Sequence, residues 1–324
     1  MKRRTLLQAT VASAATLGAP MIKAQTLPSG PIRIVVGFPP GGGTDALARV
    51  LAQKLQAMWG VNIIIDNKAG AAGVIAADYV AKQPADGNTL LMAHINSHAL
   101  ATSLQPKLAY NVERDFSPIG LVGVTPNLLI CNENQPAKTV KDLVALCKQN
   151  PGKISFASAG GGSAQHLALE MFKLRAGIDA LHVPYKGSAP AVQDLIGGQT
   201  HLLVDVSAVL MPHINSGRLK AIYVTDPQRN PMLPNVAFAR QTGYPSLETS
   251  GWQGLVGPPG MSRDTVVRLA QAIQDVMNRP EMKDKFNQIG GSVILRGPDE
   301  FTEYVASEVK RWTPVIRASG AILD

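Results

Sequence analysis

Short apolar runs alternate with amphipathic segments along most of the chain. Residues 32–38 (IRIVVGF) and 61–66 (VNIIID) are rich in β-branched side chains, whereas residues 44–59 repeat apolar positions at helical spacing. Nearly continuous apolar strands joined by amphipathic helices are typical of a parallel sheet with both faces covered. The pattern therefore predicts an α/β fold that begins strand, helix, strand and continues through a helix at 71–82 and a strand at 89–93.

The same alternation starts again near residue 119 and once more in the last third of the chain. The predicted strands lie at 127–131, 153–158, 180–185, 200–205, 219–225, 251–257 and 292–296, and the helices at 139–150, 164–177, 189–198, 262–278 and 298–320. A chain of 324 residues is long for one core, which favours two domains. We expect residues 25–122 and 226–324 to form domain 1 and residues 123–225 to form domain 2, with the chain crossing at about 118–125 and again at about 225.

Residues 1–24 resemble an export signal. The chain starts with the basic sequence MKRR, continues with a weakly apolar stretch from Leu6 to Pro20, and offers small residues up to Ala24. The pair Arg3-Arg4 also resembles a twin-arginine signal, so both export routes stay open. No later run is long and apolar enough to span a bilayer. We expect cleavage of this signal peptide and a soluble mature protein outside the cytoplasm.

The formal charge of +8 is misleading, because four of the positive residues lie in the first 24, which contain no acid. The remaining charges are mixed along the chain, which argues against a nucleic-acid partner. Cys131 and Cys147 show no zinc-binding spacing, and the sequence leaves open whether they form a disulfide or stay free.

His94 and His98 are four residues apart, a spacing that suits a metal only on a helix. The segment after residue 93 reads as an irregular loop, so no metal site is predicted there. We expect its polar residues Asn96, Ser97 and His98 to line a cleft instead.

The sequence VGFPPGGGTD places three glycines between a strand and a helix. It nearly fits two nucleotide patterns, but Pro39 and Pro40 separate the strand from the glycines, and Gly43 stands where a phosphate-binding loop needs lysine. An exported protein also has little access to nicotinamide cofactors, so no cofactor is predicted. What remains is a helix N-terminus whose free amides suit an anion, or a tight turn with no ligand.

A second loop, SAGGGSAQHL, repeats this arrangement at residues 158–167. Two glycine-rich helix N-termini, one in each α/β unit, predict a ligand that is bound from both sides of a cleft. Ser163 is an alternative nucleophile of an exported hydrolase, although the closing glycine of G-x-S-x-G is missing and His166 follows too closely to act as its base. Further along, Tyr185 ends a strand where ligands of α/β sheets usually lie. Asp205 ends another strand, where it either caps the next helix or orients a water or an ammonium group.

Taken together, VGFPPGGGTD, IIIDNKAGAAG, SAGGGSAQHLALEMF, HVPYKGSAPAVQDLIGG and VDVSAVLMPHINSGRLKAI resemble the Bug-type solute-binding proteins of tripartite tricarboxylate transporters. The resemblance covers essentially the whole mature chain. It implies a periplasmic, two-domain Venus flytrap fold in which two crossover strands form the hinge. It also implies a receptor without catalysis, expected to be a monomer, that captures one small carboxylate and passes it to membrane permease subunits.

The resemblance implies that the two glycine-rich loops bind the carboxylate, partly through ordered waters. Relatives bind amino acids, di- and tricarboxylates or aromatic acids, so the ligand class stays open. The predicted ligand-binding residues are Pro40, Gly41, Gly42, Gly43, Thr44, Asp45, Ser97, Ala159, Gly160, Gly161, Ser163, Tyr185 and Asp205.

Overall fold

The computed structural model describes residues 30–41, 43–185, 187–226, 229–244, 248–288 and 290–321. The export signal predicted for residues 1–24 lies outside these ranges. Within them, no helix is both long enough and apolar enough to cross a membrane.

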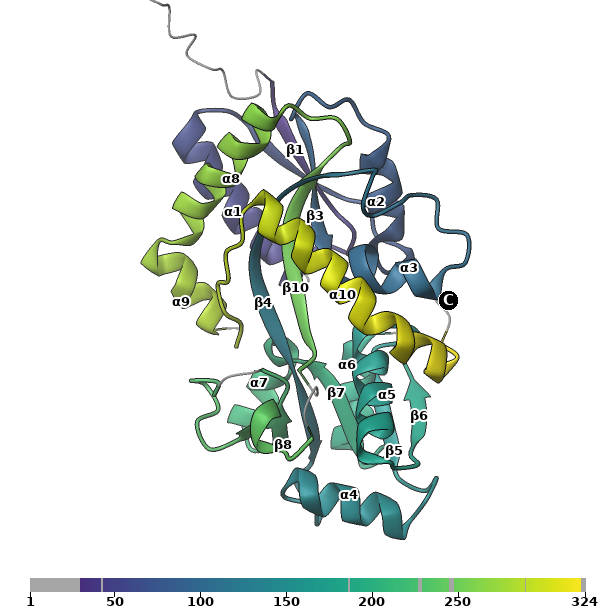
Figure 1. The fold of residues 1–324 in the computed structure, drawn as a ribbon. Helices are drawn as coiled ribbons and strands as arrows, with labels where there is room; N and C mark the ends of the chain where they lie inside the picture. Colours follow the sequence, from purple (N-terminus) through teal and green to yellow (C-terminus); the bar gives the residue numbers. More distant parts are fainter. Residues whose placement is uncertain are drawn as a thin grey trace, which may run out of the picture.

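One half of the molecule is a mixed sheet covered by helices on both faces (Figure 1). Its strands run in the order β2 (Ile63–Asn67), β1 (Ile32–Val36), β3 (Thr89–His94), β10 (Ser250–Gly257) and β4 (Ser117–Asn132). The first three strands are parallel, and β10 is antiparallel to both of its neighbours. The strand, helix, strand start and the α/β class predicted from the sequence are confirmed.

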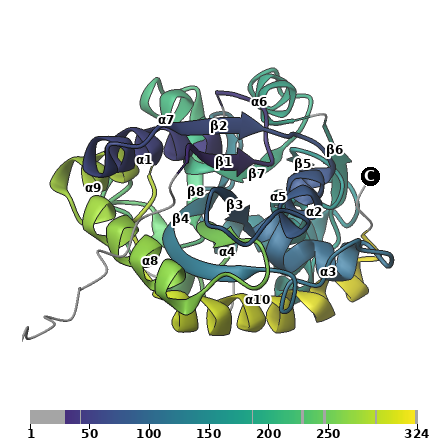
Figure 2. The same ribbon diagram turned by 90° about the horizontal axis from the view of Figure 1, so that it is seen from above.

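The helices of this half pack on the sheet through two hydrophobic cores. One core contains residues of α1 (Gly43–Trp59), α8 (Arg263–Met277) and α9 (Pro280–Gln288). The other contains residues of α2 (Val74–Ala81), α3 (Ala101–Leu104) and α10 (Pro298–Ser319). Figure 2 shows the first set on one side of the molecule and α2 and α3 on the other. The helices pack in this way because apolar residues recur at helical spacing along one face. In α8, for example, Val266, Leu269 and Ile273 are all buried.

The other half is built on the far end of β4. Residues 117–126 of this strand pair with β10, and residues 127–132 pair with β7 and β8, so one strand serves both halves (Figure 1). The remaining elements are α4 (Val140–Gln149), β5 (Ser155–Ser158), α5 (Ala164–Ala176), β6 (Leu181–Pro184), α6 (Ser188–Ile196), β7 (Leu202–Val206), α7 (Ser207–Asn215), β8 (Leu219–Val224) and β9 (Ala237–Phe238).

The chain passes back from the second half to the first half beside β4. The amide of Thr225 donates to the carbonyl of Asn127 at 2.9 Å, and the Thr225 hydroxyl donates to the carbonyl of Thr249 at 2.7 Å, directly before β10. Between these points β9 pairs with β8, and Tyr244 packs against Phe172 of α5. We therefore propose to end domain 2 after Tyr244 rather than at residue 225.

Three local predictions need correction. The segment after His94 is helical, forming a π-helix (Asn96–Leu100) and α3, because its apolar side chains enter the core. Residues 292–296 form no strand and make only isolated bridges to β4. Helix α9 was not predicted at all.

The two cysteines are free and buried, Cys131 on β4 and Cys147 on α4. Burial raises the pKa of the Cys147 thiol to about 11, and it also raises the pKa of Cys131. Both therefore behave as small core side chains rather than as reactive thiols.

Candidate functional site

A cavity of about 660 Å³ lies between the two halves. Its walls come from the loop after β1 and from α1, β3, β4, β10 and α9 on one side, and from the segments around α5, α6 and α7 on the other. Six predicted residues line it: Thr44, Ala159, Gly160, Gly161, Ser163 and Tyr185. The volume is in the usual range for a small-molecule site.

The second glycine-rich loop, residues 159–163, leaves free amides facing this cavity. The hydroxyl of Ser163 caps α5 by accepting from the amide of His166 at 3.2 Å, and it donates to the carbonyl of Gly160 at 2.7 Å. Among the described residues, the amides of Gly161, Ala164 and Gln165 meet no acceptor. All three residues line the cavity, so these amides are available to an anion.

The backbone of this loop requires glycine. Gly160 has φ 142° and Gly162 has φ 68°, both in the region that side chains disfavour. A Cβ on Gly160 would also lie 3.3 Å from the carbonyl oxygen of Tyr185.

Two stacked histidines hold the loop from behind. The rings of His166 and His182 lie parallel with centroids 3.8 Å apart. Nδ1 of His166 accepts from the amide of Gly162 at 3.1 Å, and Nε2 of His182 lies 2.7 Å from the Ser158 hydroxyl, which itself contacts Gly160. Burial, followed by the neighbouring His166, lowers the pKa of His182 to about 4. The His182 ring that supports the loop is thus neutral at pH 7.

The first glycine-rich loop is organised by an acid. Asp45 is 2% exposed, and its Oδ2 accepts from the Gly41 amide at 2.9 Å and from Nε of Arg49 at 2.8 Å. Its Oδ1 accepts from Asn67, which also donates to the carbonyl of Phe38. Burial alone would raise the pKa of Asp45, but the hydrogen bonds from Arg49, Gly41 and Asn67 outweigh it and lower the pKa to about 2.

Four helices begin at the cavity. First-turn residues of α1, α5, α6 and α7 line it, among them Thr44, Ala164, Ser188 and Ala208. Each helix N-terminus carries a partial positive charge and unpaired amides. The cavity is therefore suited to a negatively charged group, although the described lining residues include no lysine or arginine.

Comparison with known proteins gives the family. Residues 47–321 match the family described as "Tripartite tricarboxylate transporter family receptor". The chain belongs to this receptor family. It is 37% identical over 303 residues to the protein BugT of Bordetella pertussis, and the match covers 93% of each chain.

Solved structures of family members confirm the periplasmic-binding-protein fold. The receptor matches Rpa4515 of R. palustris, solved with adipate, at a TM-score of 0.82 and 32% identity, covering 91% of this chain and 99% of that one. It matches MatC of Rhodopseudomonas palustris, solved with bound malate, at a TM-score of 0.78 and 30% identity, covering 90% and 100%.

Several residues predicted to bind the receptor's ligand do not line the cavity. Gly42 lies outside the described residues, and Gly43 begins α1. Pro40 and Gly41 are exposed and are not among the lining residues, and the carboxylate of Asp45 is bonded within its own loop. Ser97 is 3% exposed, and its hydroxyl contacts the His94 carbonyl and the ring of His98 inside the core.

One of the two roles predicted for Asp205, capping the next helix, is wrong. The N-cap of α7 is Val206, so Asp205 does not cap that helix with its side chain. Its Oδ1 accepts from the Val206 amide at 2.7 Å and from Nε2 of Gln165 at 3.2 Å. Asp205 is fully buried, and burial raises its pKa. It therefore positions Gln165, which does line the cavity.

Tyr185 lines the cavity with its ring. The phenol donates to Oδ2 of Asp194 at 2.7 Å, and burial together with this bond raises the pKa of Tyr185 to about 12.

Asn96 lines the cavity as expected from the sequence, whereas His98 is buried in the core. Sequence reasoning missed a group of other polar lining residues: His94, Asn127, Gln165, Ser188 and Gln253. The sequence did contain one signal for them, because successive side chains of a strand point to opposite faces of the sheet. In the segment GWQ, Trp252 packs in the core while Gln253 points to the opposite face of β10, which faces the cavity. Choosing that face as the functional one requires knowledge of the strand pairing.

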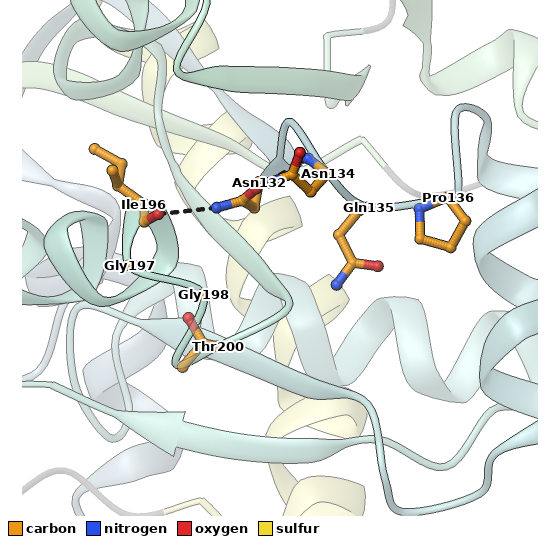
Figure 3. Close-up of a pocket in the computed structure, with 8 residues that line it drawn as sticks. All are labelled: Asn132, Asn134, Gln135, Pro136, Ile196, Gly197, Gly198 and Thr200. Carbon is orange, nitrogen blue, oxygen red and sulfur yellow. Dashed lines mark hydrogen bonds between the residues drawn. The ribbon is translucent and has the colours of Figure 1, made fainter.

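A second, smaller pocket lies at the distal end of the other half. Figure 3 shows Asn132, Asn134 and Gln135 around it, with Nδ2 of Asn132 donating to the Ile196 carbonyl at 2.9 Å. All of its lining residues come from one half of the receptor, in contrast to the cavity between the halves.

Proposed function

We propose that this receptor binds the carboxylate of a small organic acid in the cavity between its halves and delivers the acid to the permease subunits of a tripartite transporter. The observation that supports the proposal is the set of unpaired amides of Gly161, Ala164 and Gln165 at the start of α5. Charge-assisted hydrogen bonds to such amides contribute about 1.5–3 kcal/mol each, enough for a few of them to hold one carboxylate. The relatives solved with adipate and malate support the same chemistry.

The proposal includes the setting in which the receptor works. Residues 1–24 carry the features of a cleavable signal peptide, by the general or the twin-arginine route, and we infer a periplasmic protein that acts as a monomer. Because delivery needs no chemical change, the receptor is proposed to have no catalytic activity.

The alternative of a hydrolase that uses Ser163 is not favoured by the geometry. The Ser163 hydroxyl donates to the Gly160 carbonyl, and the nearest imidazole, His166, accepts a backbone amide through Nδ1. A nucleophile needs a base within hydrogen-bond reach of its own hydroxyl, and no described side chain fills that place.

Thermal denaturation of the mature protein against a panel of acids tests the proposal. A true ligand at one hundred times its Kd adds about 2.7 kcal/mol of stability, which appears as a rise in Tm. The panel pairs each acid with its methyl ester, which keeps the body of the molecule and removes the carboxylate. Stabilisation by an acid and none by its ester is expected. Equal stabilisation by both members of every pair would show that the carboxylate is not what is bound.

A further inference from the structure

The sheet wall of the cavity carries a second recognition feature. On β3 and β10 the residues His94 and Gln253 are directly opposite in the antiparallel register, so their side chains lie on the same face as neighbours. Asn127 lies on β4 next to β7 and also lines the cavity. These three polar residues belong to strands and not to the glycine-rich loops.

Three lining residues of the cavity contain a hydrogen-bond acceptor with no partner in the described part of the chain. Oδ1 of Asn127 and Oε1 of Gln253 are buried and unpaired, as is Oδ1 of the lining residue Asn96. The orientation of the Asn127 amide is fixed, because its Nδ2 donates to the carbonyl of Thr249 at 2.7 Å. A buried acceptor without a donor costs about 1–3 kcal/mol, so such a group calls for a bound donor.

His94 is a hydrogen-bond donor on the same wall. Nδ1 of His94 accepts from the backbone amide of Asn96 at 3.2 Å, which leaves the ring proton on Nε2. Burial lowers the pKa of His94 to about 4, so the ring is neutral at pH 7. His94 therefore contributes a neutral N–H on the strand position opposite Gln253.

We propose that this wall recognises a neutral group that both donates and accepts hydrogen bonds, a hydroxyl or a carboxamide, at the far end of a monocarboxylate. The inference rests on the proposed function, in which the amides of α5 hold the carboxylate. An ionised second carboxylate only accepts, so it would place its charge against the oxygen of Asn127, whose amide orientation is fixed.

An ammonium group at the far end of the ligand is disfavoured as well. The described lining residues contain no aspartate or glutamate to pair with it, and the four helix N-termini direct positive charge at the cavity. Lys186, between Tyr185 and Gly187, lies outside the described residues. The rest of the lining includes the rings of Phe38, Tyr185 and Phe286, which suits an apolar body between the two polar ends.

A series of acids that differ only at the far end tests this inference. The probes are 6-hydroxyhexanoate, hexanoate, adipate and 6-aminohexanoate, together with benzoates that carry hydroxyl, hydrogen, carboxylate or aminomethyl at position 4. Isothermal titration calorimetry on the mature protein measures each Kd. In the series that binds, the hydroxy acid is expected to bind at least about tenfold more tightly than the other three.

Two variants of Gln253 connect that preference to the wall. Gln253→Leu removes the acceptor at similar size and should bring the hydroxy acid to within about threefold of the unsubstituted acid. Gln253→Glu keeps the shape but adds a charge, and it should shift preference toward the amino acid. Circular dichroism and Tm establish that both variants fold.

The outcomes separate the two proposals. Preference for adipate or the dicarboxylic benzoate in the wild-type receptor, or an unchanged hydroxy preference in Gln253→Leu, overturns this inference and leaves carboxylate capture intact. If no acid of either series binds while a methyl ester does, carboxylate capture fails and this inference fails with it.

Discussion

The two glycine-rich loops look alike in sequence and differ in what their backbone can offer. The first reads GGGTD at residues 41–45, and the second reads GGGSA at residues 160–164. Each follows a strand and leads into a helix, α1 or α5. From sequence alone they form a symmetrical pair of anion sites.

The side chain at the helix start makes the difference. In the first loop a carboxylate, Asp45, accepts the amide of Gly41 and adds a buried negative charge. In the second loop a hydroxyl, Ser163, donates to the carbonyl of Gly160, while the amide of Gly161 stays unpaired. Asp45 thus takes the Gly41 amide of its own loop, whereas the Ser163 hydroxyl binds a carbonyl and leaves the Gly161 amide without an acceptor among the described residues. Glycines and a helix start are therefore insufficient to specify an anion site.

This comparison assigns unequal roles to the loops. We expect the second loop to be the main carboxylate anchor and the first to contribute mainly Thr44 and the N-terminus of α1. The predictions below test that asymmetry.

The largest effect on ligand affinity is expected from Ala164→Pro. Proline removes the first free amide of α5 at a helix position where it is tolerated, and the preceding Ser163 already has the extended conformation that proline requires, with ψ 159°. Losing one charge-assisted hydrogen bond of about 1.5–3 kcal/mol should weaken binding about ten- to a hundredfold. Calorimetry with whichever acid raises the Tm most provides the measurement.

The control for this variant is Ala164→Ser, which keeps the amide at the same position. Its affinity should stay within about threefold of the wild type. If the serine and proline variants lose affinity equally, the side chain and not the amide is responsible, and the second loop loses its assigned role.

The next largest effect is expected on stability, from Asp45→Asn in the first loop. The change removes the charge that accepts from Arg49 and Gly41, so the free energy of unfolding should fall by about 2 kcal/mol. Urea denaturation measures this loss. Ligand affinity should fall much less than in Ala164→Pro, because Asp45 does not line the cavity.

Asp299→Asn is the matched control for this prediction. Asp299 pairs with Arg263 at 2.6 Å on the surface, where both side chains are more than half exposed. Exposed ion pairs contribute little, so this variant should be much closer to the wild type. A loss of affinity in Asp45→Asn as large as in Ala164→Pro would make the two loops equivalent after all.

The sequence predicted the parts of the site that follow from chain order. Residues 159–163 end a strand and begin a helix, and that position at the edge of an α/β sheet is enough to place them at a cavity. The sequence also showed that Asp45 and Asp205 each lie close to a junction between a strand and a helix. Their roles could not, because each depends on partners distant in sequence, such as Asn67 for Asp45 and Gln165 for Asp205.

The polar wall was harder to predict than the loops. Asn127 and Gln253 lie within strands that are otherwise apolar, and in sequence nothing shows which face of β4 or β10 meets the cavity. The segment after His94 was misassigned for a related reason. Its polar residues suggested a loop, but burial of Ala99 and Leu100 makes it helical and places Ser97 in the core. Tertiary contacts decided both cases.

The smallest of the expected effects is a difference in acid sensitivity between the loops. The pKa of His182 behind the second loop is lowered to about 4, so between pH 6.5 and 4 the unfolded chain binds a proton that the folded chain does not. Stability therefore falls as pH decreases through that window, by at most about tenfold per pH unit in the folding equilibrium constant.

Asp45 changes stability in the same direction as His182, but at lower pH. Its pKa is lowered from 3.8 to about 2, so its contribution is complete above 3.8 and is lost only as pH falls toward 2. His94 and His98, with pKa values lowered to about 4 and about 3 by burial, titrate in the same direction as His182, so the wild-type curve alone cannot isolate one loop. The His182→Gln variant can, because an amide can still bond to the Ser158 hydroxyl but does not titrate. From pH 7 to 5 the urea midpoint of the wild type should fall more than that of His182→Gln, whereas Asp45→Asn should follow the wild-type slope over this range. Parallel curves for the wild type and His182→Gln would mean that the histidine pair does not make the second loop the more acid-sensitive of the two.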